Sequence, residues 1–526
     1  METLFRSPQE FAVSSVVSDL SGGCMGGSLP TRPARTEAAL KIMGWKGLPI
    51  LRAFAACAIG CVLLVLPMDA TPAGPEIFLR DEPEAYVLID KLQGLGLLPA
   101  LMTGTRGLEA REVALEAGKE EHAGDPFVDG MLRFLQLEGA RDLDFRIGGG
   151  LGYSNAGYIP PNAQDFPVPD GTEYRVNGFF RAAPYSWLGL QGRAEAVAGS
   201  DGERTGRIGE TSLRLGWPQA TLEAGRFAVW YGPGRHGALL FTTNAEPLIG
   251  VRIRNPRPIA FPKPIGFLGV FQYDFFMARI DTGGPFPDSL VSGMRFALRP
   301  NRYLEVGASR ALHFGGEGRD EGVSTFFDIL TGQRESEGNT PKGNSLASVD
   351  AKVHLPFRIQ PVVLYGEWGG EDQSRPFIFT RHAWLWGVFL PSIGPFRVAD
   401  LRVEYGTTLT NEPGVWYQHP QYPHQYNGQI LGHPMGTDAR DLFLEARLFL
   451  LPSSYVEMSY DRTERSFPGP AGEQRKRITG GLVAWLTRNV RAEGKVAYDR
   501  ISDEGGVPGR DGSNKTIELS AAWQYR

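Results

Sequence analysis

The chain has 526 residues, of which 42% are hydrophobic and 21% charged, and its formal net charge is -5. This mild charge, without a basic tract interleaved with aromatic residues, excludes nucleic acid as an expected partner. No run of 18 apolar residues occurs, so a helix that spans a membrane is not expected. The mean hydropathy of -0.21 is unusual for a helical membrane protein but normal for a β-barrel, because half of each barrel strand is polar.

The longest apolar run, residues 53–66, has the features of a secretory signal peptide rather than of a buried core helix. A short basic region precedes it, and small residues follow it. Since signal peptides begin at the N-terminus, we expect translation to start at Met43 and the signal peptide to cover residues 43–73. Residues 1–42 are then a non-translated or removed extension. All three cysteines precede the expected cleavage site, which excludes disulfides and cysteine–metal sites from the mature protein.

Residues 74–140 predict a short helical segment on the periplasmic side. Pro83 marks a helix start, and apolar residues follow it at i, i+3, i+4 and i+7 spacing until Gly94. Residues 108–117 are strong helix formers, and a third helix begins at Pro126. A unit of this size has a thin core of its own, so we expect it to pack on or into the mouth of the structure that follows.

Residues 141–526 repeatedly place an apolar residue at every second position, with charged residues or glycine between them. In residues 142–154, for example, Leu143, Phe145 and Ile147 alternate with Asp144 and Arg146. Side chains alternate across a strand, so each such segment has one apolar and one charged face. With many strands and no helical layer among them, this pattern predicts an all-β membrane protein. It is an antiparallel transmembrane β-barrel with lipid outside and water inside. At about 20 residues per strand and connection, the length predicts 16–20 strands.

Two irregular stretches in the barrel carry the groups most suited to binding a sugar, and a third, residues 315–344, predicts an extracellular loop. The first stretch contains a Gly-Pro-Gly turn, and the second contains three of the eight histidines. Aromatic faces and planar polar groups suit the apolar faces and hydroxyl edges of sugar rings. The candidate polysaccharide-binding or lumen-plugging residues are Trp230, Tyr231, Arg235, His236, Asn244 and Glu246 in the first stretch, and Trp416, Tyr417, His419, Tyr422, His424, Tyr426 and His433 in the second.

Metal binding and catalysis are less well supported by the sequence. His419, His424 and His433 lie in a segment broken by proline and glycine, without the spacing typical of a metal site, so no metal is expected. Nucleophile-elbow, zinc-protease and P-loop motifs are absent. A glycosidase pair such as Asp281 and Asp288 is the less favoured interpretation, because inward acids on barrel strands usually pair with arginine. We therefore expect no catalytic residue, no cofactor and no enzymatic activity.

Two motifs resemble the capsule assembly protein Wzi family. They are Tyr-Gly-Pro-Gly-Arg-His-Gly from Tyr231, followed by Asn-Ala-Glu-Pro from Asn244, and Leu-Gly-His-Pro-Met-Gly-Thr-Asp from Leu431. The order of signal peptide, helical segment and large barrel is also similar. The resemblance implies an outer-membrane barrel of about 18 strands and a lectin-like role in holding capsular polysaccharide at the cell surface. Residues 315–344 and the terminal Arg526 have no counterpart that we can match.

The sequence therefore predicts a non-enzymatic barrel in the outer membrane of a Gram-negative bacterium. It would bind capsular or exopolysaccharide and assist its assembly or attachment at the cell surface. Its expected partners are the polysaccharide, outer-membrane lipid and the polysaccharide export machinery. The alternative is an outer-membrane porin or a sugar-selective channel, which needs an open lumen. The two bulky stretches, stiffened by proline and glycine, favour an occluded lumen and hence the first function.

Overall fold

The structure is a computed structural model, and it describes residues 74–526 apart from short gaps. The gaps are residues 121–123, 140, 201, 203, 218, 256, 333–335, 338–339, 372, 376–377, 395–396, 411, 467–470 and 526. The expected extension, the signal peptide with its cleavage site, all three cysteines and Arg526 therefore lie outside the described residues.

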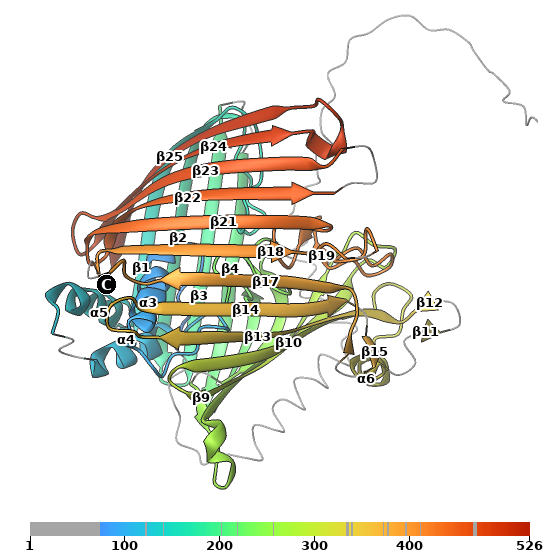
Figure 1. Cartoon of the computed structure of the whole chain (residues 1–526), viewed down its shortest axis with the longest axis horizontal. Coiled ribbons are helices and arrows are strands. Elements are labelled where there is room, and N and C mark those ends of the chain that lie inside the picture. Colours follow the sequence, from blue (N-terminus) through green and yellow to red (C-terminus); the bar gives the residue numbers. More distant parts are fainter. Residues whose placement is uncertain are drawn as a thin grey trace, which may run out of the picture. The chain divides into compact units, whose positions relative to one another are not determined.

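Eighteen strands of the described chain form one closed antiparallel barrel, in which β25 pairs with β1 (Figure 1). This confirms the predicted fold and strand number. The barrel strands are β1 (Leu143–Ser154), β2 (Gly171–Tyr185), β3 (Leu188–Gly199), β4 (Arg204–Trp217), β5 (Ala220–Phe227), β6 (Leu248–Arg254), β8 (Val270–Ile280), β9 (Ser289–Asn301), β10 (Leu304–Phe314), β13 (Gly343–Leu355), β14 (Val362–Glu371), β17 (His382–Leu390), β18 (Ala399–Thr407), β21 (Ala439–Leu451), β22 (Ser454–Arg465), β23 (Glu473–Trp485), β24 (Val490–Ser502) and β25 (Gly512–Tyr525).

The alternation in sequence becomes an outer and an inner face of the barrel. On β25, Leu519 and Trp523 point outward and are 60% and 45% exposed, whereas Gln524 is fully buried in the lumen. There its side chain accepts two hydrogen bonds from Arg146 of β1. The outer face is thus an apolar belt, and the charged side chains that alternate with it bond to one another inside. This arrangement is stable only if the belt faces lipid.

The two ends of the barrel differ, as Figure 1 shows. At one end, here called the helical end, lie the C-terminus and the helices α3 (Pro83–Gly94), α4 (Ala110–Lys119) and α5 (Pro126–Gly139). Most strand connections at this end are short, for example residues 186–187, 302–303 and 452–453. At the other end, the loop end, the connections are long. Within the described residues, no helix is both long and apolar enough to cross a bilayer.

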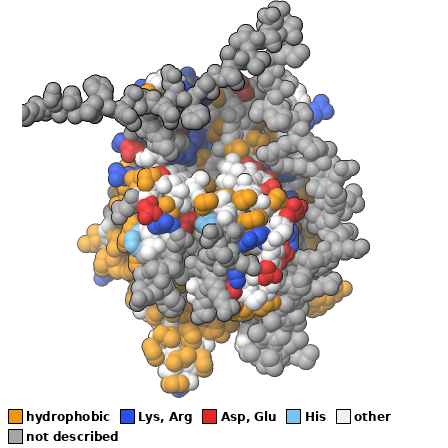
Figure 2. Space-filling view, turned by 90° about the vertical axis from the view of Figure 1, so that its right-hand side faces the viewer, with side chains coloured by type: hydrophobic (Ala, Val, Ile, Leu, Met, Phe, Trp, Pro, Cys, Tyr) orange, Lys and Arg blue, Asp and Glu red, His pale blue; other side chains and the backbone are white. Residues whose placement is uncertain are grey.

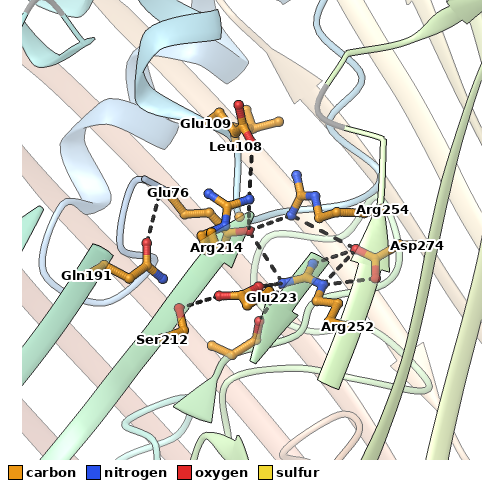
Figure 3. A network of polar contacts seen from close by, with 12 residues as sticks. Glu76, Leu108, Glu109, Gln191, Ser212, Arg214, Glu223, Arg252, Arg254 and Asp274 are labelled. Atoms are coloured by element: carbon orange, nitrogen blue, oxygen red, sulfur yellow. Dashed lines mark hydrogen bonds and ion pairs between the residues drawn. The ribbon is translucent and has the colours of Figure 1, made fainter. Parts of the chain in front are cut away.

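The N-terminal segment is tied into the lumen by a network of charged side chains, drawn in Figure 3. One carboxylate oxygen of Glu76 lies 3.4 Å from a guanidinium nitrogen of Arg214, 3.5 Å from one of Arg252 and 2.7 Å from one of Arg254. Arg252 also bonds to Asp274 on β8. All of these side chains are buried. The negative charge of Glu76, in the segment before α3, is therefore balanced by arginines of the barrel wall.

Smaller elements lie in the connections. They are β7 (Ile259–Ala260), η1 (Ile265–Leu268), α6 (Val323–Thr331), β11 (Ser336–Glu337), β12 (Thr340–Pro341), β15 (Gln373–Arg375), β16 (Ile378–Phe379), β19 (Gln425–Tyr426), β20 (Gln429–Ile430) and η2 (Glu504–Gly506). Residues 315–344, predicted as a loop, contain the helix α6. Its Phe326, Ile329 and Leu330 pack on Leu312 and Phe314. Their i, i+3 and i+4 spacing marks an apolar helix face inside a segment rich in glycine.

Candidate functional site

The first irregular stretch lies in the connection between β5 and β6, residues 228–247, which folds into the lumen. We call it the first plug loop. Tyr231 forms antiparallel bridges with Phe241 of the same loop and with Thr105 of the N-terminal segment. Gly232 has a φ of +135° and lies against Ala238 and Glu367, so a side chain there would be strained and crowded. The Gly-Pro-Gly motif is thus required by the inward fold of this loop.

The second stretch forms the connection between β18 and β21, residues 408–438, and also folds inward. We call it the second plug loop. Trp416 and Tyr417 are buried, and the Tyr417 hydroxyl donates to the backbone oxygen of Leu239 in the first plug loop at 2.5 Å. The same hydroxyl accepts a hydrogen bond from the backbone N–H of His433 at 3.0 Å. The two plug loops share one hydrophobic cluster with the barrel wall and together fill this part of the lumen.

Glutamates of the barrel wall hold both plug loops by their backbone. Glu404 accepts from the N–H groups of Arg235 and His236, at 2.7 and 2.9 Å. Glu367 accepts from Leu239 at 3.0 Å, and Glu371 from Tyr417 at 2.6 Å. None of these acids was predicted from the sequence. Local pattern cannot separate them from other polar residues, because every second residue of a barrel strand is polar.

The remaining predicted residues are also part of the packed plug. Asn244 donates to the backbone oxygen of Ile430, Glu246 accepts from Arg226 and Asn427, and the Tyr422 hydroxyl donates to Gly315. Trp230 and Tyr426 are buried. Among the seven predicted residues of the second plug loop, only His419 is more than slightly exposed, and its ring nitrogen accepts from two backbone N–H groups.

The histidines of the plug loops have opposite electrostatic environments. Burial lowers the pKa of His424 and of His433 to about 4. Burial also disfavours the charged form of His236, but the carboxylates of Asp461 and Asp441 outweigh it and raise its pKa to about 9. Within the described part of the chain, His419, His424 and His433 do not lie close enough together to share a metal ion.

His424 is fixed as a neutral imidazole by its two partners. Its Nε2 lies 2.6 Å from the backbone oxygen of Leu240, and its Nδ1 lies 2.7 Å from Nε2 of His313. Because a carbonyl oxygen only accepts, Nε2 of His424 carries the proton, and Nδ1 accepts from His313. A second proton on His424 would place two N–H groups against each other.

Acidification from pH 7 to pH 5 is therefore expected to destabilise the packing of the second plug loop. The folded pKa of His424 lies near 4 and the ordinary value is 6.5, so the unfolded chain binds a proton that the folded chain does not. The stability is complete above pH 6.5 and is lost as the pH falls from 6.5 toward 4, by about 2 kcal/mol at pH 5. Urea unfolding of the detergent-solubilised barrel at both pH values measures this loss.

The variant His424→Gln keeps a donor and an acceptor but cannot titrate in this range. Its loss of stability between pH 7 and pH 5 should be about 2 kcal/mol smaller than that of the unchanged protein. His433, which is also buried and neutral, supplies pH dependence that remains in the variant. An unchanged pH dependence in His424→Gln would contradict the assignment.

A polar cavity of about 260 Å³ remains in the lumen beside the plug loops. Strands β1, β2, β3, β24 and β25 line it, together with the segment around Asn162. Phe166 lies at its edge, beneath the guanidinium groups of Arg80, Arg175 and Arg207, at 4.6–5.3 Å from its ring centroid. The cavity is rich in both arginine and glutamate, and no sequence pattern indicates it.

Known proteins share this architecture. The family model described as capsule assembly protein Wzi matches residues 146–516. The chain belongs to the capsule assembly protein Wzi family. With its closed barrel and outward apolar belt, it is an outer-membrane protein of this family.

Two relatives illustrate the likeness. Over 280 residues the chain is 29% identical to an uncharacterised 55.8 kDa protein in the cps region of Klebsiella pneumoniae. The match covers 52% of this chain and 54% of that protein, so the chain spans about half the length of this curated relative. The solved structure of Wzi from Escherichia coli, described as a carbohydrate-binding β-barrel involved in group 1 capsule assembly, matches with a TM-score of 0.67. It is 20% identical and covers 85% of this chain and 99% of that chain, which shows a shared fold.

Proposed function

We propose that this member of the Wzi family binds capsular or exopolysaccharide at its loop end, without catalysis, and assists the assembly or attachment of the polysaccharide at the cell surface. Membership of the family and the filled lumen support this function. In bacterial outer-membrane barrels the short turns face the periplasm and the long loops face outward. By this rule the helical segment, residues 74–140, lies on the periplasmic side, where it is accessible to the polysaccharide export machinery.

The observation that carries the proposal is the outer surface of the second plug loop. Gln418 is exposed, and His419, Gln421 and Gln429 are partly exposed. Trp416 and Tyr417, which precede Gln418 in the chain, are buried. Amide groups offer both donors and acceptors to sugar hydroxyls. Figure 2 looks onto the loop end, where uncharged side chains lie among acidic, basic and histidine side chains. We propose that the buried aromatic residues support this surface and that its amides contact the glycan.

Replacing Gln418 and Gln429 together by alanine is expected to weaken polysaccharide binding by about 10-fold or more. Each lost hydrogen bond contributes about 0.5–1.5 kcal/mol. The measurement is the affinity of the purified barrel for the organism's own capsular polysaccharide, together with the ratio of cell-bound to released capsule. The barrel should stay folded, because both side chains lie on the outer surface.

Gln136→Ala, on helix α5 at the helical end, is the matched control and should leave binding unchanged. Heat-modifiable migration in gels shows that each variant is folded. If the double variant is folded and retains capsule as well as the control does, the second plug loop does not form the glycan surface.

The alternative function, a porin or sugar-selective channel, is tested by conductance. Since the two plug loops pack against each other and against the wall, we expect no steady openings of the unchanged protein in planar bilayers. Replacing residues 414–437 by a short Gly-Ser linker removes the second plug loop and should produce steady openings. Steady openings of the unchanged protein would favour the channel and contradict the filled lumen.

A further inference from the structure

His236, Asp441 and Asp461 bring three ligand-type side chains together at the junction of the first plug loop and the barrel wall. Nε2 of His236 lies 3.3 Å from one carboxylate oxygen of Asp441 and 3.5 Å from one of Asp461. One ligand atom from each residue lies within 4.8 Å of the other two. The loop contributes the imidazole, and the neighbouring strands β21 and β22 contribute the carboxylates. All three side chains are largely buried.

The orientation of each group is fixed by a partner outside the cluster. The His236 ring stacks on Phe443, with ring centroids 4.0 Å apart and an angle of 8° between the planes. Its backbone N–H is held by Glu404. The hydroxyl of Thr463 lies 2.8 Å from the second oxygen of Asp441 and 3.4 Å from that of Asp461. In metal sites, such outer contacts orient the ligands. Here they leave one oxygen of each carboxylate directed at the imidazole of His236.

The lack of an arginine or lysine partner distinguishes this cluster from a group of three acids elsewhere in the described chain. Glu82, Glu138 and Asp144 enclose the guanidinium of Arg181, which pairs with all three. By contrast, neither Asp441 nor Asp461 pairs with an arginine or lysine among the residues that the structure describes. The nearby guanidinium of Arg477 is bonded to Asp499 instead, at 2.7 and 2.8 Å. Two buried carboxylates this close together need a cation between them, which is either a protonated His236 or a bound metal ion.

We propose that His236, Asp441 and Asp461 bind one divalent transition-metal ion, with Zn²⁺ as the best match. An imidazole nitrogen with two carboxylate oxygens suits zinc, whereas calcium and magnesium prefer sites made of oxygen alone. The observed separations of 3.3–3.5 Å between nitrogen and oxygen are those of ligands around one small ion. Such an ion joins the first plug loop to β21 and β22, and water completes its coordination. This inference does not depend on polysaccharide binding.

Zinc titration of the full-length barrel tests the proposal. The protein is purified without a histidine tag in detergent, treated with a chelator, and titrated with ZnCl₂ by calorimetry, with CaCl₂ as comparison. The expected result is one equivalent of bound Zn²⁺ and no comparable binding of Ca²⁺. Asp461→Asn and His236→Gln should each weaken zinc binding by at least about 100-fold, and Thr463→Val by about 10-fold, because loss of an outer contact costs about 10–100-fold.

His382→Gln, which changes an exposed histidine on β17, is the matched control and should bind zinc like the unchanged protein. Heat-modifiable migration identifies the folded variants, and Asp441→Asn serves as a third ligand variant. If the unchanged protein binds no zinc stoichiometrically, or if folded Asp461→Asn and His236→Gln bind it equally well, the proposal is overturned. The cluster is then an ion pair between a protonated His236 and the two aspartates.

Discussion

Glu76→Gln is expected to lower the free energy of unfolding by about 3 kcal/mol, because it removes one buried carboxylate that faces three guanidinium groups. The value lies at the low end for a broken buried ion pair, since Arg252 keeps Asp274 and Arg214 keeps Glu109. Urea unfolding of the barrel in detergent measures the loss. Trypsin should also cleave the helical segment, residues 74–140, faster in the variant.

Glu112→Gln is the matched control in the same helical segment. Glu112 of α4 pairs with Arg257, whose side chain is 40% exposed. An ion pair of this exposure contributes at most about 1 kcal/mol. The two substitutions are chemically identical, but Glu76 faces three buried guanidinium groups and Glu112 faces one that is partly exposed. Equal and small losses would show that the charge network in Figure 3 does not tie the helical segment to the wall.

The barrel and its helices were predictable because their signals are local. Alternation over 7–15 residues specifies each strand, and the length of the chain limits the strand number. The helix after Pro83 follows from its proline start, its apolar spacing and its glycine end. The helix α6 was missed because it has only nine residues and glycine and charged residues surround it.

The candidate site was predictable only in part, because its signals are not local. The Gly-Pro-Gly turn and the clustered aromatic residues identify both plug loops. The sequence leaves open whether these aromatic residues face a sugar or the lumen, and burial of Trp416 and Tyr417 places them inside. The pairing of His236 with Asp441 depends on the register of β21 and on the inward fold of a loop about 200 residues earlier. No periodicity encodes that contact.

The second large effect on stability is expected from a substitution on the outer face of β25. Leu519→Arg places a guanidinium on the outer belt at the middle of β25, where Leu519 is 60% exposed and pairs with Leu151 of β1. Lipid cannot solvate the charge at this depth. The substitution is expected to cost about 2–4 kcal/mol of barrel stability. Folding into lipid vesicles followed by urea unfolding measures it.

Ser520→Arg, one residue further on, is the matched control because it adds the same side chain to the opposite face. Ser520 lines the polar cavity of the lumen, where Glu493 and Glu518 also lie. An arginine there meets water and carboxylates, so the cost should be well below that of Leu519→Arg. Because neighbouring side chains of a strand point to opposite faces, a one-residue error in register would exchange the two results. A larger cost for Ser520→Arg would therefore show that the faces of β25 are assigned the wrong way round.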